Sequence, residues 1–136
     1  MVRLIMGEKG QGKTKKLIEM LHHAAQEEPG NVVCIEATRS MTYDIHYHIR
    51  LIDAKEFDLN SYESFRGFLC GLYAGNYDIS HIFVDNLLKI VGGELNGDTE
   101  AFLNWLDAFS ERNGVKFTLS VSADASAATE AMQRYL

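Results

Sequence analysis

The sequence has few of the residues that zinc-binding and disulfide-bonded proteins require. It contains two cysteines, Cys34 and Cys70, and no Cys/His spacing typical of a zinc site. Cys34 falls in an expected strand and Cys70 in an expected helix, so both are expected to be small buried hydrophobic residues. This usage is typical of a protein of the reducing cytoplasm.

Positive charge and long apolar runs are also scarce. The chain carries 13 Lys and Arg against 19 Asp and Glu, a net charge of −6. Nucleic-acid binding is therefore disfavoured, because a phosphate backbone needs a basic face, whereas a nucleotide needs only one local positive site. No apolar run reaches membrane-spanning length, and the residues before the first glycine are too few for a signal peptide. We expect one cytoplasmic domain, residues 1–136, without a membrane segment.

The most informative segment is Gly7 to Thr14, which reads Gly-Glu-Lys-Gly-Gln-Gly-Lys-Thr. It matches G-x-x-x-x-G-K-[ST] at every fixed position. The preceding residues 2–6 are apolar and largely branched, as in a buried strand, and residues 15–21 open a helical pattern. Strand, loop and helix together are the context in which this motif binds phosphate.

Each residue type in the motif has a chemical reason. Glycines let successive backbone N–H groups converge on phosphate oxygens, and the N-terminus of the following helix adds partial positive charge. Lys13 is expected to reach the β- and γ-phosphates, and the Thr14 hydroxyl to ligate Mg²⁺. The expected nucleotide-binding residues are Gly7, Glu8, Lys9, Gly10, Gln11, Gly12, Lys13, Thr14 and Lys15. The segment resembles the P-loop of the P-loop NTPase superfamily, which implies that the cofactors are ATP and Mg²⁺.

Strands and helices alternate along the rest of the chain. Apolar runs at 31–36, 81–85 and 115–121 predict buried strands, and 49–52 is a candidate for a short additional strand. Helices are expected after the loop, from Asn60 or Ser61 to Gly75, from Asp98 or Thr99 to Asn113, and from Ser122 or Asp124 to about Tyr135. Residues 91–97 are a glycine-rich connection. The alternation predicts a three-layer α/β/α sandwich with a mostly parallel sheet.

Two further segments bear on metal binding. Tyr43 to Arg50 alternates apolar and polar residues, which would place His46 and His48 on one side of a strand. No third ligand stands near this pair, and exposed strand histidines are commoner than metal ligands. The run His81 to Asp85 ends an apolar strand on an acid, the pattern of a Walker B strand whose carboxylate holds Mg²⁺. Asp85 is therefore expected to share the metal with Thr14.

Candidates for the remaining catalytic roles lie at other strand ends. Asn86 stands where many such ATPases carry a glutamate base, and an amide can orient water but cannot take its proton. Glu36 resembles in placement the water-polarising glutamate of the RecA, replicative-helicase and clock-ATPase group, and is otherwise a surface carboxylate at a strand end. With Lys13 it forms the expected catalytic pair. Ser120 and Ser122 resemble the polar sensor position of the same ATPases, although Ser122 can instead cap a helix. Arg39 and Arg50 are candidates either for contacts with phosphates or for salt bridges.

The resemblance extends to two other groups. Thymidine kinase has a similar order of elements, but the Asp-Glu pair and the cysteine-rich zinc lasso of that family are absent here. Small uncharacterised bacterial P-loop proteins are also similar. A GTPase is disfavoured because no Asn-Lys-x-Asp segment occurs. The resemblance implies an ATP-binding protein of RecA-like architecture, a slow Mg²⁺-dependent ATPase or nucleotide switch that acts as a homo-oligomer or with a protein partner. A nucleoside-like kinase and a non-hydrolysing ATP-binding module are the alternatives.

Overall fold

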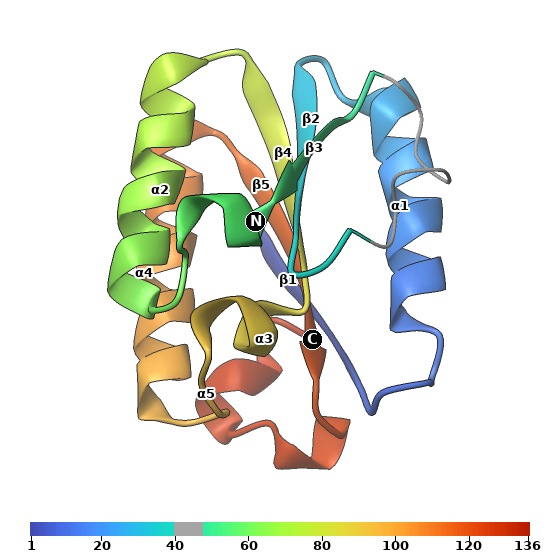
Figure 1. The fold of residues 1–136 in the computed structure, drawn as a ribbon, viewed down its shortest axis with the longest axis vertical. Coiled ribbons are helices and arrows are strands. Elements are labelled where there is room, and N and C mark those ends of the chain that lie inside the picture. The colour runs from blue at the N-terminus through green and yellow to red at the C-terminus, as the bar shows by residue number, and fades with distance from the viewer. Residues whose placement is uncertain (40–47) are drawn as a thin grey trace.

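The computed structural model describes residues 1–39 and 48–136 and shows a five-stranded sheet between layers of helices (Figure 1). The strands are β1 (Val2–Gly7), β2 (Asn31–Glu36), β3 (Arg50–Asp53), β4 (Ile79–Asp85) and β5 (Lys116–Ser122). Their order is β1-β5-β4-β2-β3, and every neighbouring pair is parallel. The expected three-layer α/β fold is confirmed. Because the strands are parallel, their carboxyl ends meet at one edge of the sheet, where ligands of such folds bind.

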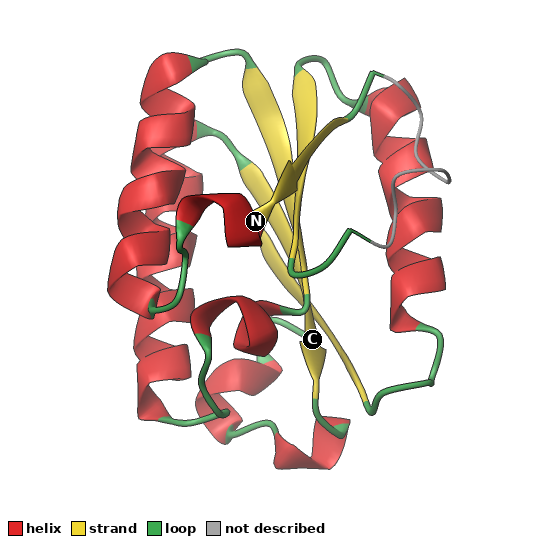
Figure 2. Ribbon diagram, in the orientation of Figure 1, coloured by secondary structure: helices red, strands yellow, loops and turns green. Residues whose placement is uncertain are grey.

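Helices cover the two faces of the sheet unequally. The helix α1 (Lys13–Glu27) lies on one face, and α2 (Tyr62–Gly75), α3 (Leu87–Val91), α4 (Gly97–Asn113) and α5 (Glu130–Gln133) lie on the other (Figures 1 and 2). Two 3₁₀ turns, η1 (Ala54–Phe57) and η2 (Ala125–Ala127), complete the elements. In the described part of the chain, no helix is both long and apolar enough to cross a membrane.

The alternation of side chains along each strand sorts the core into two halves. Ile5, Cys34 and Phe83 pack with Leu17 and Leu21 beneath α1. The larger half, beneath α2 and α4, contains a buried set of aliphatic and aromatic residues that includes Leu4, Ile35, Val84, Phe65, Phe102 and Phe117. Since Phe83 faces α1, Asp85 two residues later faces α1 as well. The period of the strand therefore directs this carboxylate to the side of the sheet that carries the Gly7–Thr14 loop.

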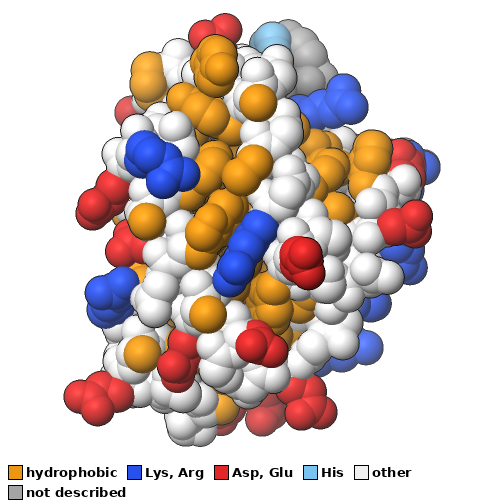
Figure 3. Space-filling model, turned by 90° about the vertical axis from the view of Figure 1, so that its left-hand side faces the viewer, with side chains coloured by type: hydrophobic (Ala, Val, Ile, Leu, Met, Phe, Trp, Pro, Cys, Tyr) orange, Lys and Arg blue, Asp and Glu red, His pale blue; other side chains and the backbone are white. Residues whose placement is uncertain are grey.

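Aromatic rings join the two long helices of the larger layer. Phe65 of α2 stacks on Phe102 of α4 with a centroid separation of 5.7 Å, and the Arg66 guanidinium lies 5.7 Å from the centroid of Trp105. Figure 3 shows apolar side chains gathered in a band across this face, with a basic side chain lying along it.

The structure differs from the sequence-based expectation near the C-terminus and after β4. A continuous helix to about Tyr135 is wrong, because the segment forms η2 and the short α5. The Asp124 carboxylate accepts a hydrogen bond from the Ser126 backbone at 3.0 Å, and the Leu4 backbone donates to the Tyr135 carbonyl at 2.6 Å. These bonds turn the chain and attach its tail to the edge of β1. The helix α3 was not expected, and α4 is capped by Asn96 rather than Asp98 or Thr99.

The additional strand expected at 49–52 is confirmed as β3, one residue later than predicted. The alternation at 43–47 and His46 lie outside the described residues. His48 is exposed, and within residues 1–39 and 48–136 no group of three His, Cys, Asp or Glu side chains could hold a metal ion.

Candidate functional site

Glycines shape the loop between β1 and α1. Gly10 and Gly12 have φ angles of 89° and 79°, in the left-handed region that favours glycine. Gly12 is the N-cap of α1. A Cβ at Gly7 would lie 3.2 Å from the Gln11 side-chain oxygen, closer than ordinary contact. The backbone conformation of the loop therefore favours glycine at Gly12, which the motif specifies, and at Gly10, which the motif leaves variable.

Hydrogen bonds within the loop hold it in shape. The Lys13 ammonium donates to the Glu8 carbonyl at 3.0 Å, and the Glu8 backbone N–H donates to Gln11 Oε1 at 2.8 Å. The Gln11 N–H returns to the Glu8 carbonyl at 3.2 Å. Gln11 thus braces the loop from within, a role that the motif alone does not reveal. The brace keeps Lys13 over the loop with hydrogen-bonding capacity left for an anion.

A cavity of about 530 Å³ opens at the carboxyl edge of the sheet, beside the loop. That volume is in the range of small-molecule and cofactor sites. Its lining residues are Lys9, Gly10, Gly12, Lys13, Thr14, Ala37, Thr38, Asp85, Asn86, Lys89, Ser120 and Ser122. The structure thus brings together the loop, the end of β4, the end of β5 and the residues after β2.

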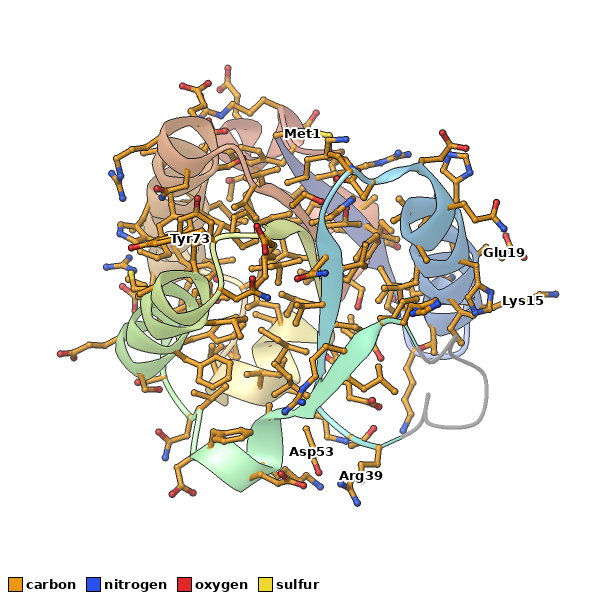
Figure 4. All side chains as sticks on the ribbon, turned by 90° about the horizontal axis from the view of Figure 1, so that it is seen from above. Met1, Lys15, Glu19, Arg39, Asp53 and Tyr73 are labelled. Atoms are coloured by element: carbon orange, nitrogen blue, oxygen red, sulfur yellow. The ribbon has the colours of Figure 1, made fainter. Side chains whose placement is uncertain are left out.

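Other expected site residues lie outside this lining. Gly7, Glu8 and Gln11 shape the loop but do not line the cavity. The Lys15 side chain is exposed and points away from the sheet on the outer side of α1 (Figure 4). Arg39 is paired with Asp53 at 3.6 Å and Glu56 at 3.0 Å, as its position beside Asp53 in Figure 4 shows. Arg50 lines a different cavity beside β3.

Asp85 is held at the cavity by its neighbour on β5. The Ser120 hydroxyl donates to Asp85 Oδ1 at 2.9 Å and accepts from the Asn86 backbone N–H at 2.7 Å. Burial raises the pKa of Asp85, whereas the Ser120 hydrogen bond and the positive charge of Lys13 lower it. A divalent cation would favour the ionised form further. The donor set of a buried carboxylate and the Thr14 hydroxyl, all oxygen, fits Mg²⁺.

Glu36 ends β2 next to Asp85. The two residues are paired in the parallel register of β2 and β4, and Glu36 is 2% exposed. Cys34, two residues earlier, packs beneath α1, so Glu36 lies on the same face of the sheet as Asp85. The cavity is lined by Ala37 and Thr38, the next residues, rather than by Glu36. Two carboxylates therefore stand side by side at the strand ends, with Asp85 lining the cavity.

Several lining residues were not expected from sequence. Ala37 and Thr38 follow the recognised end of β2, so their proximity to that end was the available signal. Lys89 was missed entirely, because it lies on α3, which the residue pattern did not predict. Both serines of β5 line the cavity, and Ser120 has the second role of bonding to Asp85.

These features define the class at the level of the fold: a three-layer α/β domain of RecA-like architecture, with a P-loop motif at the carboxyl edge of its parallel sheet. Among solved structures the chain is similar to the flagellar accessory protein FlaH from Methanocaldococcus jannaschii, with a TM-score of 0.57 and 13% sequence identity. The alignment covers 96% of this chain and 64% of that one. This chain thus corresponds to less than two thirds of that protein. No protein-family model and no curated protein matches the sequence.

Proposed function

We propose that this chain is an ATP-binding P-loop protein that works as a slow Mg²⁺-dependent ATPase or as a nucleotide switch. The observation that carries the proposal is the cavity in which the braced loop, Lys13, Thr14 and the buried Asp85 meet. Backbone N–H groups, an ammonium group and the N-terminus of α1 favour a polyphosphate at this point. The similarity in fold to a flagellar accessory protein is compatible with this function and does not specify it.

In the proposal, each residue has one task. Gly10, Gly12 and Lys13 bind the phosphates, and Thr14 and Asp85 hold Mg²⁺, which would neutralise charge on the phosphates. Glu36 is the proposed residue that polarises the attacking water, from its position beside Asp85. Asn86 lines the cavity but cannot accept a proton. We therefore expect turnover well below the typical enzyme rate of about 10 per second.

Completion of the site by a second copy or by a protein partner is also part of the proposal. Among the described residues no arginine lines the cavity, and Arg39 is engaged with Asp53 and Glu56. Where an arginine finger is supplied, it accelerates hydrolysis by about 10³–10⁵. A chain without one is suited to slow hydrolysis until a partner docks.

One observation favours the kinase alternative. We call the cavity of about 530 Å³ beside the loop the nucleotide cavity. A smaller cavity of about 280 Å³ adjoins it and shares Ala37 and Lys89 with it. Its other lining residues are Ala54, Lys55, Asp58, Leu59, Asn60 and Ile90. A small phosphoryl acceptor would have to bind beside the nucleotide, and the smaller cavity lies in that position.

Calorimetric titration of Mg·ATP tests the proposal. Lys13→Ala removes the ammonium group and should weaken binding by about 1.5–3 kcal/mol, the effect of a hydrogen bond to a charged group. Lys15→Ala is the matched control, because Lys15 is the neighbouring lysine that points away from the cavity. Equal affinities of the wild type and Lys13→Ala, or equal losses in the two variants, would contradict the proposed phosphate site.

A further inference from the structure

The short helix α3 is built to present one charged side chain. Its residues Leu87, Ile90 and Val91 are buried, with exposed fractions of 0, 6 and 5%. Successive helical residues are about 100° apart, so Lys89 falls on the side opposite to this buried face. Lys89 is exposed, consistent with that position. The packing of α3 therefore fixes the direction in which the lysine leaves the backbone.

Both ends of α3 are fixed as well. Asn86, just before it, has a φ of 65°, and its backbone N–H is bonded to Ser120 Oγ at 2.7 Å. Gly92, just after it, has a φ of 69° and donates to the Leu88 carbonyl. A non-glycine residue in the left-handed region is uncommon and persists only where the surroundings hold it. The start of α3, the helix that carries Lys89, is thus bonded to the same hydroxyl that orients Asp85.

The positive charge of Lys89 has no partner among the residues that the structure describes. The Lys89 ammonium group has no hydrogen bond or ion pair within residues 1–39 and 48–136, in contrast to the side chains of Arg39 and Lys13. It lines the nucleotide cavity together with Asp85, Asn86 and Ser120. The loop bounds one side of that cavity, and the β4–α3 junction bounds another. A phosphate chain held by the loop would therefore lie in the same cavity as the end of β4 and Lys89.

We propose that Lys89 contacts the terminal phosphoryl group of the bound nucleotide and so distinguishes ATP from ADP. This inference rests on the proposed function and adds a residue to it. An ammonium group bonds to phosphate as a compact point charge on a flexible stem, and Lys89 carries such a group into the lining of the cavity. Such a contact exists with a triphosphate and is lost with a diphosphate, which is the difference that a nucleotide switch must detect.

Calorimetric titrations of the full chain with two probes, Mg·ADP and Mg·adenylyl imidodiphosphate, test the assignment. Lys89→Ala should lower affinity for the triphosphate analogue by about tenfold or more and change affinity for Mg·ADP by less than about twofold. Lys89→Arg, which keeps the charge, should retain most of the preference for the triphosphate. Lys55→Ala is the matched control, because Lys55 lines the adjoining cavity but not the nucleotide cavity. It should leave both affinities at the wild-type value.

The outcomes separate the two proposals. If the wild type binds both nucleotides and Lys89→Ala weakens neither, or weakens both equally, Lys89 does not contact the terminal phosphoryl group. If the wild type binds neither nucleotide, the proposed function fails and this assignment fails with it. Since Lys89 is exposed, the variant should retain the wild-type circular dichroism spectrum, and a folded variant with lost triphosphate preference supports the assignment.

Discussion

At the scale of single residues, the most consequential side chain is Asp85. Asp85 is 7% exposed, and its carboxylate accepts a hydrogen bond from the Ser120 hydroxyl. Both features limit the reorientation of the carboxylate. Burial raises its pKa, which means that the ionised form is less stable in the fold than in the unfolded chain. The carboxylate is therefore kept at a cost in stability, which Mg²⁺ would offset when bound.

The first consequence is a prediction for Asp85→Asn. The amide cannot ligate Mg²⁺ as strongly, so affinity for Mg·ATP should fall by about tenfold or more. Affinity for ATP measured with a chelator should be unchanged or improved, because the variant no longer repels phosphate. Equal losses with and without Mg²⁺ would show that Asp85 is structural.

The same variant should be more stable without nucleotide. An acid whose pKa is raised on folding contributes instability that appears as pH rises past its unfolded value and persists above its folded value. Near neutral pH, Asp85→Asn should therefore raise the midpoint of thermal unfolding. A lower midpoint would mean that the carboxylate stabilises the nucleotide-free fold.

At the scale of elements, caps decide where the helices begin. Ser61, one of the two caps expected from sequence, caps α2. The helix α4 begins after Asn96, whose side chain accepts from the Asp98 and Thr99 backbone N–H groups. Thr99 completes the capping box by accepting from the Asn96 backbone N–H at 3.2 Å. The predicted caps Asp98 and Thr99 are instead residues of the first turn of α4. Asn96, Asp98 and Thr99 are all residue types that cap helices, and their closeness in sequence explains why the prediction chose the wrong one.

Asn96→Ala should therefore destabilise the protein by about 1 kcal/mol, within the range of about 0.5–2 kcal/mol for the loss of such a cap. Urea unfolding at neutral pH measures the difference, and the slope with urea should remain that of the wild type. Asn96→Ser retains a side-chain acceptor and serves as control. Equal stability of wild type and Asn96→Ala would mean that Thr99 and solvent suffice to start α4.

The elements also show what sequence could predict and what it could not. The loop and Asp85 were predictable because their signals are local: a fixed spacing in one case, an apolar strand ending on an acid in the other. The bond from Ser120 to Asp85 joins residues 35 positions apart and depends on β5 lying next to β4. Lys89 depends on Asn86 adopting a left-handed conformation that starts a helix without a side-chain cap. Such features follow from tertiary packing rather than from periodicity.

At the scale of the whole molecule, a cluster of charged and polar side chains joins the end of α1 to the amino-terminal edge of the sheet, opposite the nucleotide cavity. Glu28, just after α1, bonds to Lys116 at 2.8 Å, and its carboxylate lies 3.6 Å from His81 Nδ1, beyond hydrogen-bond distance. The other nitrogen of His81 is bonded to Thr118 at 2.9 Å. Burial lowers the pKa of His81 to about 4, although Glu28 acts to raise it. His81 is therefore neutral in the folded protein near pH 7.

Stability should consequently fall as the solution is acidified. Between the ordinary pKa of 6.5 and the folded value of about 4, the unfolded chain binds the proton and the folded protein does not, so unfolding is favoured as pH decreases. Over that range of pH, protonation of His81 in the unfolded chain lowers the free energy of unfolding by about 3 kcal/mol. Urea unfolding at pH 7 and pH 4.5 should show a smaller loss for His81→Gln, which cannot titrate, than for the wild type. Parallel losses would assign the acid sensitivity to Glu28 and other carboxylates.

The place of β5 in the sheet has a consequence for the order of folding. Within the described residues, the strand that carries the loop, β1, pairs with β5 and with no other strand. On a ribosome, β1 would emerge before the other four strands and could join the sheet only after residues 116–122 had been made. Pairing across so much intervening chain is slow, and it leaves an apolar strand exposed in the meantime. A nascent chain that stops before β5 should therefore not retain nucleotide, and nucleotide capture would report that synthesis has passed β5.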